Sequence, residues 1–238
     1  MMTIPQSIGN WAQRQIRALV IAALLAGLSA PAGAFQAEHP LTGRRIAPVM
    51  GVGGADWLER NEREAEEHPD QALDALGLKP GMIVADVGAG TGFMSLRMAK
   101  RVGPMGKVYA EDVQPEMLSR LRRNAAKAKL SNVETVLGNE ADPKLPPNAL
   151  DLILLVDVYH EFSQPQRMLR GMRQALKPDG RLVLLEYRKE DPTIPIRPEH
   201  KMSVQEVKIE LEAEGFRMSQ VIESLPRQHI LILTKPPN

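Results

Sequence analysis

The sequence predicts an α/β fold: a mostly parallel β-sheet with helices on both faces, followed by an antiparallel β-hairpin. From residue 83 to residue 185, short apolar segments of strand length alternate with helical segments. Strands separated by helices of this length form parallel sheets through right-handed crossovers. Near the end, two β-rich segments, 216–224 and 229–234, are joined by a connection of only a few residues. A link this short permits an antiparallel hairpin but no parallel crossover.

The composition is that of a soluble globular protein and excludes several classes of function. The chain has 238 residues and a net charge of +1. This charge is far below the excess of lysine and arginine typical of proteins that neutralise nucleic-acid phosphates. Cysteine is absent, so disulfides, thiolate metal sites and a cysteine nucleophile are excluded. Aromatic residues make up only 4%, which argues against a surface that stacks on bases.

The first segment has the order of a secretory signal peptide. Arg14 and Arg17 precede an apolar run, residues 18–28, and small residues ending at Ala34 follow. The alternative is a membrane anchor that is never cut, but the run is shorter than the roughly 20 residues needed to span a bilayer. We therefore expect residues 1–34 to be removed by cleavage after Ala34. The mature protein is expected to be exported, periplasmic or secreted, without stable membrane insertion.

The next segment, residues 35–69, is expected to precede the main domain as a tether and a helix. Residues 35–53 are rich in proline and glycine, which is typical of a tether. Residues 55–67 are dense in glutamate and arginine, and Glu59 and Arg63 have the i,i+4 spacing of a helical ion pair.

The main domain, residues 70–238, follows as a regular series of elements. In chain order we expect a helix at 70–76, a strand at 83–87, a helix at 94–101, a strand at 107–113, a helix at 115–128, strands at 133–137 and 150–156, a helix at 164–176, a strand at 181–185 and a helix at 203–214. Residues 150–156 are the most apolar of these and are expected at the sheet centre. Ser163 is expected to cap the helix after it, and residues 177–180, Lys-Pro-Asp-Gly, are expected to form a turn.

A glycine-rich turn follows the first strand of this series. Gly88, Gly90 and Gly92 lie between the strand and a helix, and glycine is needed where the backbone takes a positive φ or a ligand approaches closely. A dinucleotide site would place its third glycine at position 93, which is Phe93 here. Asp86 precedes the glycines and suits a ligand that carries an ammonium group better than a pyrophosphate. The turn therefore predicts a nucleoside that bears an amino acid.

The stretch Asp86-Val87-Gly88-Ala89-Gly90-Thr91-Gly92 after an apolar strand resembles the first motif of class I S-adenosylmethionine-dependent methyltransferases. The resemblance extends over roughly residues 70–235. It implies a Rossmann-like, doubly wound sheet of seven strands in the order 3-2-1-4-5-7-6, with the last inserted strand antiparallel. It also implies S-adenosylmethionine as the cofactor, bound around Asp86, Gly88, Ala89, Gly90 and Gly92.

The end of the second strand resembles the family position at which a carboxylate binds both ribose hydroxyls. Asp112 falls on that position, at a distance from Gly88 close to the spacing of ribose acids in α/β nucleotide sites. Glu111 stands where the family often has an apolar residue, so either carboxylate could face the ribose, and Asp112 is favoured. Val113 would pack on the adenine.

Polar residues after the third and central strands complete the site that the resemblance implies. Asn139 or Asp142 would contact the adenine, with an exposed loop as the alternative. Asp157 would lie beside the transferable methyl group, and Tyr159 and His160 would line the acceptor pocket. His160 could serve as a general base near neutral pH; alternatively, its ring only caps the following helix.

Two further segments could approach this site. The helix around Trp57 could fold over the cofactor as a lid, or it could be a packing helix anchored by Trp57. The loop 188–202 follows the fifth strand, at the sheet edge where substrate contacts are usual, although a charged loop is often only solvated. Its charged residues are Arg188, Arg197, His200 and Lys201.

The expected function is methyl transfer to a small-molecule acceptor. No metal is expected, because the sulfonium methyl is already electrophilic and no metal-binding motif is apparent. The alternatives are an exported module that binds the cofactor without transferring a methyl group, and a nicotinamide-dependent oxidoreductase, which Phe93 and the C-terminal hairpin disfavour.

Overall fold

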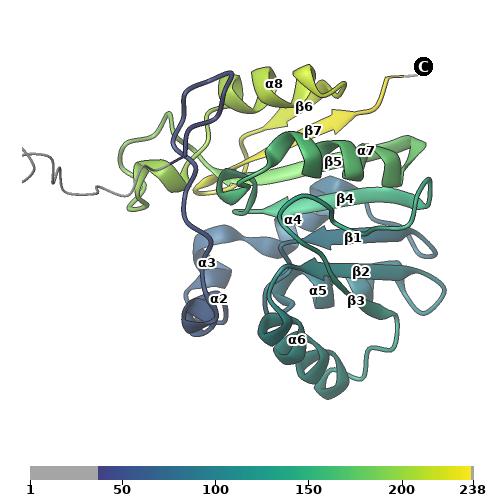
Figure 1. Ribbon diagram of the computed structural model, residues 1–238. Coiled ribbons are helices and arrows are strands. Elements are labelled where there is room, and N and C mark those ends of the chain that lie inside the picture. Colours follow the sequence, from purple (N-terminus) through teal and green to yellow (C-terminus); the bar gives the residue numbers. More distant parts are fainter. Residues whose placement is uncertain (1–36, 237–238) are drawn as a thin grey trace, which may run out of the picture. The chain divides into compact units, whose positions relative to one another are not determined.

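A seven-stranded sheet runs through the part of the chain that the structure, a computed structural model, describes: residues 37–236 (Figure 1). The strand order is β3-β2-β1-β4-β5-β7-β6, as predicted. The strands are β1 (Ile83–Val87), β2 (Lys107–Asp112), β3 (Val133–Leu137), β4 (Leu150–Val156), β5 (Leu176–Tyr187), β6 (Arg217–Ile222) and β7 (Gln228–Thr234). The first five pair in parallel, and β7 is antiparallel to both β5 and β6. The predicted signal peptide, residues 1–34, lies outside the described residues.

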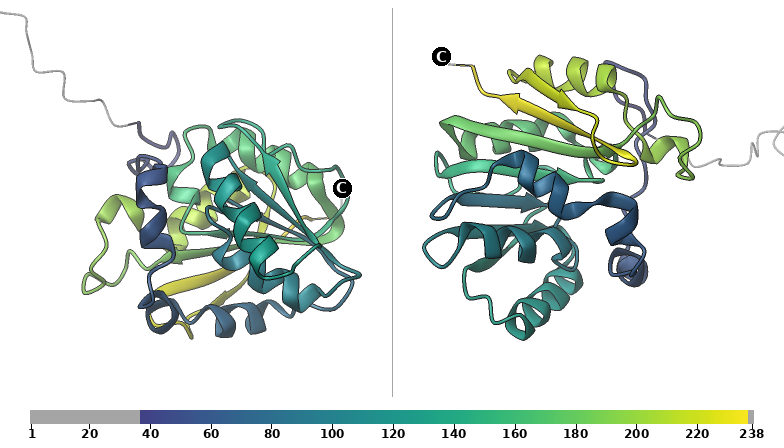
Figure 2. Two further views of the ribbon diagram at one scale, coloured as in Figure 1. Left: turned by 90° about the horizontal axis from the view of Figure 1, so that it is seen from below. Right: turned by 180° about the vertical axis from the view of Figure 1, so that it is seen from behind.

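Helices cover both faces of the sheet (Figure 2). They are α4 (Pro69–Leu76), α5 (Phe93–Val102), α6 (Pro115–Lys127), α7 (Pro165–Ala175) and α8 (Val204–Ala213). Helices α4, α5 and α6 pack on one face, and α7 and α8 pack on the other. Alternate residues of β4 serve the two cores: Leu152 faces the α4–α5 side and Ile153 faces the α7–α8 side. This two-sided burial explains the continuous apolar run of the central strand.

No helix within residues 37–236 is long and apolar enough to cross a membrane.

Two local predictions around α7 are wrong. Ser163 does not cap the helix; its hydroxyl donates to Glu140 instead, at 2.9 Å, and the N-cap is Gln164 without a side-chain hydrogen bond. The expected turn at 177–180 is an irregularity inside β5, where the pairing with β4 jumps over these residues. The strand therefore begins earlier than the apolar pattern indicates.

The single helix expected at 55–67 is two short helices, α2 (Ala55–Leu58) and α3 (Arg63–Glu67), after a 3-10 turn, η1 (Val52–Gly54). The predicted pair between Glu59 and Arg63 does not form. Arg63 Nε lies 2.7 Å from Glu67 Oε2, while Glu59 accepts a hydrogen bond from Asn124. The chain turns between the two helices, so Glu59 and Arg63 no longer share a helix face.

The segment expected as a tether is packed on the domain in its described part. We call residues 37–50 the N-terminal strap; in Figure 1 it runs past the sheet edge at which the parallel strands end. Arg44 is buried and pairs with Glu210 of α8, with 2.9 Å between Nε and Oε1. Ala47 N donates to the carbonyl of His160 at 3.0 Å. Despite its proline and glycine content, this segment is therefore not a free tether but packs against the domain.

Candidate active site

A cavity of about 530 Å³ lies at the carboxyl edge of the parallel strands, the position at which open α/β sheets bind ligands. The glycine turn, the strap, α2, α3 and the loop after β5 all contribute to its wall. The predicted site residues in the wall are Gly88, Gly90, Glu111, Asp112, Val113, Asn139, Asp157 and His160. The predicted site residues outside the wall are Asp86, Ala89, Gly92, Asp142 and Tyr159.

The glycine turn brings backbone close to the cavity. Gly88 has a φ of +73° and Gly90 a φ of +55°. Residues other than glycine rarely adopt such positive φ values. A Cβ atom on Gly88 would lie 2.4 Å from a methyl group of Val158. Ala89 and Gly92 do not line the cavity but stabilise the turn. Ala89 N donates to the Glu111 carbonyl, and Gly92 is the N-cap of α5.

Asp86 is buried beneath this turn and does not reach the cavity wall. The Ser95 hydroxyl donates to Asp86 Oδ2 at 2.5 Å. Burial raises the pKa of Asp86 to about 6, against the opposing effect of that hydrogen bond. Asp86, which was expected to meet the ligand's ammonium group, instead packs beneath the glycine turn and bonds to Ser95.

Two carboxylates at the end of β2 face the cavity side by side. Asp112 accepts hydrogen bonds from Gly90 N and Gln114 N, both at 2.8 Å. Glu111 accepts only a long bond from Gly88 N, at 3.4 Å, and its Oε1 has no partner within the described chain. Burial, and next the charge of Asp112, raise the pKa of Glu111 to about 8. Near neutral pH Asp112 is thus the better acceptor for ribose hydroxyls.

Of the residues expected near the adenine, the cavity includes Val113 and Asn139 but not Asp142. The Asp142 side chain turns back on its own loop, and its Oδ1 accepts from Lys144 N at 2.8 Å. A short polar side chain that bonds to the backbone two residues on forms such a turn readily.

Asp157 stands at the end of β4 with an unusual backbone. Its φ is +50°, and such strain in a residue other than glycine often marks a functional site. Gln228 Nε2 donates to Oδ2 at 2.7 Å, whereas Oδ1 lacks a partner among residues 37–236. Burial, followed by the charge of Glu67, raises the pKa of Asp157 well above its ordinary value.

Tyr159 and His160 follow β4 in a 3-10 turn, η2 (Tyr159–Glu161), and point in different directions. The expectation that Tyr159 lines the acceptor pocket is wrong. Its ring is fully buried, and its hydroxyl donates to Glu210 Oε2 at 2.9 Å. His160 does line the cavity. The bond to Glu210 keeps the Tyr159 side chain in the core, away from the cavity.

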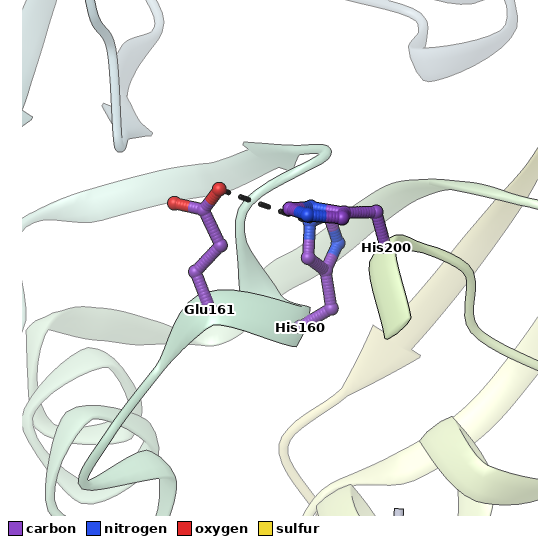
Figure 3. Close-up of side chains that lie close together, drawn as sticks. All are labelled: His160, Glu161 and His200. Carbon is purple, nitrogen blue, oxygen red and sulfur yellow. Dashed lines mark hydrogen bonds and ion pairs between the residues drawn. The ribbon is translucent and has the colours of Figure 1, made fainter. Parts of the chain in front are cut away.

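His160 is held between a buried carboxylate and a second imidazole. Its Nδ1 lies 2.6 Å from Glu186 Oε2 of β5, and its Nε2 lies 3.1 Å from His200 Nδ1. His200 ends a short 3-10 turn, η3 (Pro198–His200), in the loop after β5. Figure 3 shows the two rings beside the Glu161 carboxylate. Glu161 and Glu186 were not predicted as site residues, because nothing in the sequence around them distinguishes them from other buried acids.

The loop 188–202 contributes only part of its charge to the site. Arg197 and His200 line the cavity. Arg188 instead pairs with Glu223 at 2.7 Å, and Lys201 donates to the carbonyl of Ile194 at 2.7 Å. The latter two stabilise the loop and do not contact the site.

Helices α2 and α3 place aromatic and arginine side chains on the cavity wall. The sequence indicated Trp57 here, but not its partner Arg60. Trp57 is 49% exposed yet lines the cavity, so it is no buried packing anchor. The guanidinium of Arg60 lies 3.7 Å from the centre of its ring. Arg63 and Tyr187 bond to the buried Glu67. This arrangement fits the lid better than the packing helix.

The chain is similar in sequence to known methyltransferases. The profile of a family described as a methyltransferase domain matches residues 78–224. The ubiquinone/menaquinone biosynthesis C-methyltransferase UbiE of Escherichia fergusonii is 32% identical over 118 residues, 49% of this chain and 47% of the relative. The chain thus spans about half the length of the curated relatives it matches.

Solved structures show the same fold. A SAM-dependent methyltransferase from Aquifex aeolicus has 33% identity and a TM-score of 0.74, covering 78% of this chain and 98% of its own. A putative type 11 methyltransferase from Sulfolobus solfataricus has 22% identity and a TM-score of 0.59, covering 73% and 95%. The glycine turn, the carboxylates at the end of β2, the strand order, the family profile and the Aquifex aeolicus structure lead to one conclusion: this chain belongs to the class I S-adenosylmethionine-dependent methyltransferase family.

Proposed function

We propose that this enzyme methylates a small organic acceptor that has an apolar body and an ionisable hydroxyl or similarly acidic group. The observation that carries the proposal is one continuous cavity, which joins the glycine turn and Asp112 at one end to the Glu186-supported His160 at the other. Cofactor and acceptor can therefore lie in the same enclosure, as transfer between them requires.

The end of the cavity near β1 and β2 fits S-adenosylmethionine. When bound, this cofactor supplies an electrophilic methyl group on a sulfonium. Asp112 would accept hydrogen bonds from the ribose hydroxyls, and Val113 would pack on the adenine. The unpartnered Oδ1 of Asp157 is available to a cationic or hydrogen-bond-donating part of the cofactor.

His160 is placed to receive the acceptor's proton. A carboxylate only accepts hydrogen bonds, so Glu186 fixes the proton of neutral His160 on Nδ1 and leaves the Nε2 lone pair as an acceptor. His200 Nδ1 lies 3.1 Å from Nε2, so the His200 ring must turn aside before Nε2 can act as a base. The acceptor gains a methyl group and loses a proton, which Nε2 can take. The Glu186 carboxylate, 2.6 Å from Nδ1, then faces the imidazolium that forms.

The remaining wall favours a small apolar acceptor. Trp57, Leu58, Phe162 and Ile196 contribute apolar surface to the cavity. Three arginines, Arg60, Arg63 and Arg197, line it as well. The relative from Escherichia fergusonii is named for ubiquinone/menaquinone biosynthesis, which supports an acceptor with an aromatic or quinone-like ring and an apolar substituent.

A labelled-methyl assay with a panel of phenols and hydroquinones tests the proposal. Mature protein should bind S-adenosylmethionine more tightly than NAD and should transfer label to at least one acceptor. His160→Gln should lower kcat by about 10²–10⁴-fold, the usual contribution of a general base, with the cofactor Kd unchanged. Cofactor binding without transfer to any acceptor would instead favour a binding module.

A further inference from the structure

We propose that His160, His200 and Glu161 form a binding site for one divalent zinc-type metal ion in the acceptor end of the cavity. One ligand atom from each of these three side chains lies within 4.8 Å of the other two. They come from two separate segments, η2 and η3, that meet at this point (Figure 3). Two imidazoles and one carboxylate match the donor set of catalytic zinc sites, which leave a fourth position open.

The distances are close to those of a loaded site. Zinc–nitrogen bonds of about 2.0–2.1 Å in a tetrahedron place neighbouring ligand atoms about 3.3 Å apart. His160 Nε2 and His200 Nδ1 are 3.1 Å apart, and Glu161 Oε1 is 4.0 Å from His160 Nε2. Among residues 37–236, Glu161 accepts hydrogen bonds from Met50 N alone, both at 3.3 Å. Its carboxylate can therefore move the roughly 0.7 Å that separates it from the tetrahedral distance to Nε2.

The surroundings of His160 also match those of a metal ligand. Ligating histidines almost always donate their second ring N–H to a carboxylate or a carbonyl, which orients the ring. Glu186 accepts that bond at 2.6 Å, is fully buried and also fixes Tyr159 N. Glu161 and Glu186 thus bring two carboxyl groups beside the His160 ring, the kind of group that attracts a dication.

A metal here would change the role of His160 in the proposed reaction. The ion would occupy the Nε2 lone pair and bind the acceptor's hydroxyl oxygen at its open position, lowering the pKa of that hydroxyl as a Lewis acid. The hydroxyl oxygen would first lose its proton to solvent. The methyl group would then go either to this oxygen or to the ring carbon beside it. This role rests on the proposed function; binding of the ion does not.

Metal binding can be tested without any acceptor. Tag-free protein treated with chelator and then titrated with Zn²⁺ should bind one ion per chain, and Co²⁺ should give the absorption spectrum of a four-coordinate site. His200→Ala and Glu161→Gln should weaken Zn²⁺ binding by at least about 10–100-fold, as loss of metal-site groups does. His68→Asn, at an exposed histidine outside the cavity, is the matched control and should bind as the wild type does.

S-adenosylmethionine affinity, measured on every variant, separates the two proposals. Unchanged cofactor binding shows that a variant is folded. Wild-type protein that binds Zn²⁺ no more tightly than His200→Ala overturns the metal site and leaves the transferase intact. Full methyl transfer by chelator-treated protein overturns the Lewis-acid role and leaves His160 as the base.

Discussion

Buried carboxylates surround the cofactor end of the cavity, and their protonation decides what each can bind. Burial raises the pKa of Glu111 to about 8. It also raises the pKa of Asp112, but there backbone N–H donors, with Gln114 the largest, act in the opposite direction. The two neighbouring acids at the end of β2 thus differ in protonation. Glu111 is largely neutral near pH 7, whereas Asp112 accepts hydrogen bonds from backbone N–H groups.

The first prediction separates these two acids. Asp112→Asn should weaken S-adenosylmethionine binding by about 10–100-fold, because a charge-assisted hydrogen bond contributes roughly 1.5–3 kcal/mol. Glu111→Gln keeps the shape of a protonated glutamate and should change the affinity little. Titration calorimetry at pH 7 measures both. The reverse ranking would assign the ribose to Glu111.

The second prediction concerns stability against pH. Because the folded-state pKa of Glu111 lies above its unfolded value of 4.5, the folded state binds the proton more tightly. This residue's contribution therefore declines as pH rises from about 4.5 to 8, by up to about 1.4 kcal/mol per pH unit, and then levels off. Denaturant unfolding across that window should show a smaller decline for Glu111→Gln. Parallel curves for the two proteins would contradict the raised pKa.

At the scale of elements, the N-terminal strap is held by one buried acid of α8. Glu210 bonds to Arg44, to Thr42 and to the Tyr159 hydroxyl. The strap in turn donates to the His160 carbonyl and to the Glu161 carboxylate. The segment before the main domain is thus part of the wall that positions the acceptor end of the cavity.

The third prediction tests this attachment. Arg44→Met should destabilise the protein by about 3–5 kcal/mol, since removing one partner of a buried ion pair leaves an uncompensated charge. The matched control is Arg170→Met, which removes an ion pair of similar length to Glu214 from an exposed arginine and should have little effect. Urea unfolding measures both. Equal losses would show that the strap is not anchored by charge.

At the scale of the whole molecule, we propose that residues 1–34 direct export and are then removed. Protein recovered from its native host should begin at Phe35 and lie outside the cytoplasmic membrane. Replacing Leu24 and Leu25 with arginine should retain it uncleaved in the cytoplasm, because each charge costs about 2.5–3.5 kcal/mol in an apolar segment. Mass spectrometry and fractionation test this. An intact Met1 on abundant cytoplasmic protein would contradict export.

The sequence alone determined the fold class, the strand order through the family resemblance, and the meeting of the glycine turn with Asp112 at one sheet edge. These features depend on local signals: the alternation of apolar strands with helices, a short final link, and glycines directly after a strand. Gly88 and Gly90 follow the end of β1, Asp112 is the last residue of β2, and the carboxyl ends of parallel strands meet at one sheet edge. Their proximity therefore follows from the topology.

Only the tertiary structure decided the acceptor end. His160, Glu186 and His200 come from three segments, and no spacing in the chain indicates that their side chains meet. Similarly, Tyr159 turns into the core because Glu210, far along the chain, offers its hydroxyl a buried acceptor. Local sequence sets where a turn occurs. Which side chain of that turn faces a cavity depends on partners that packing brings from elsewhere in the chain.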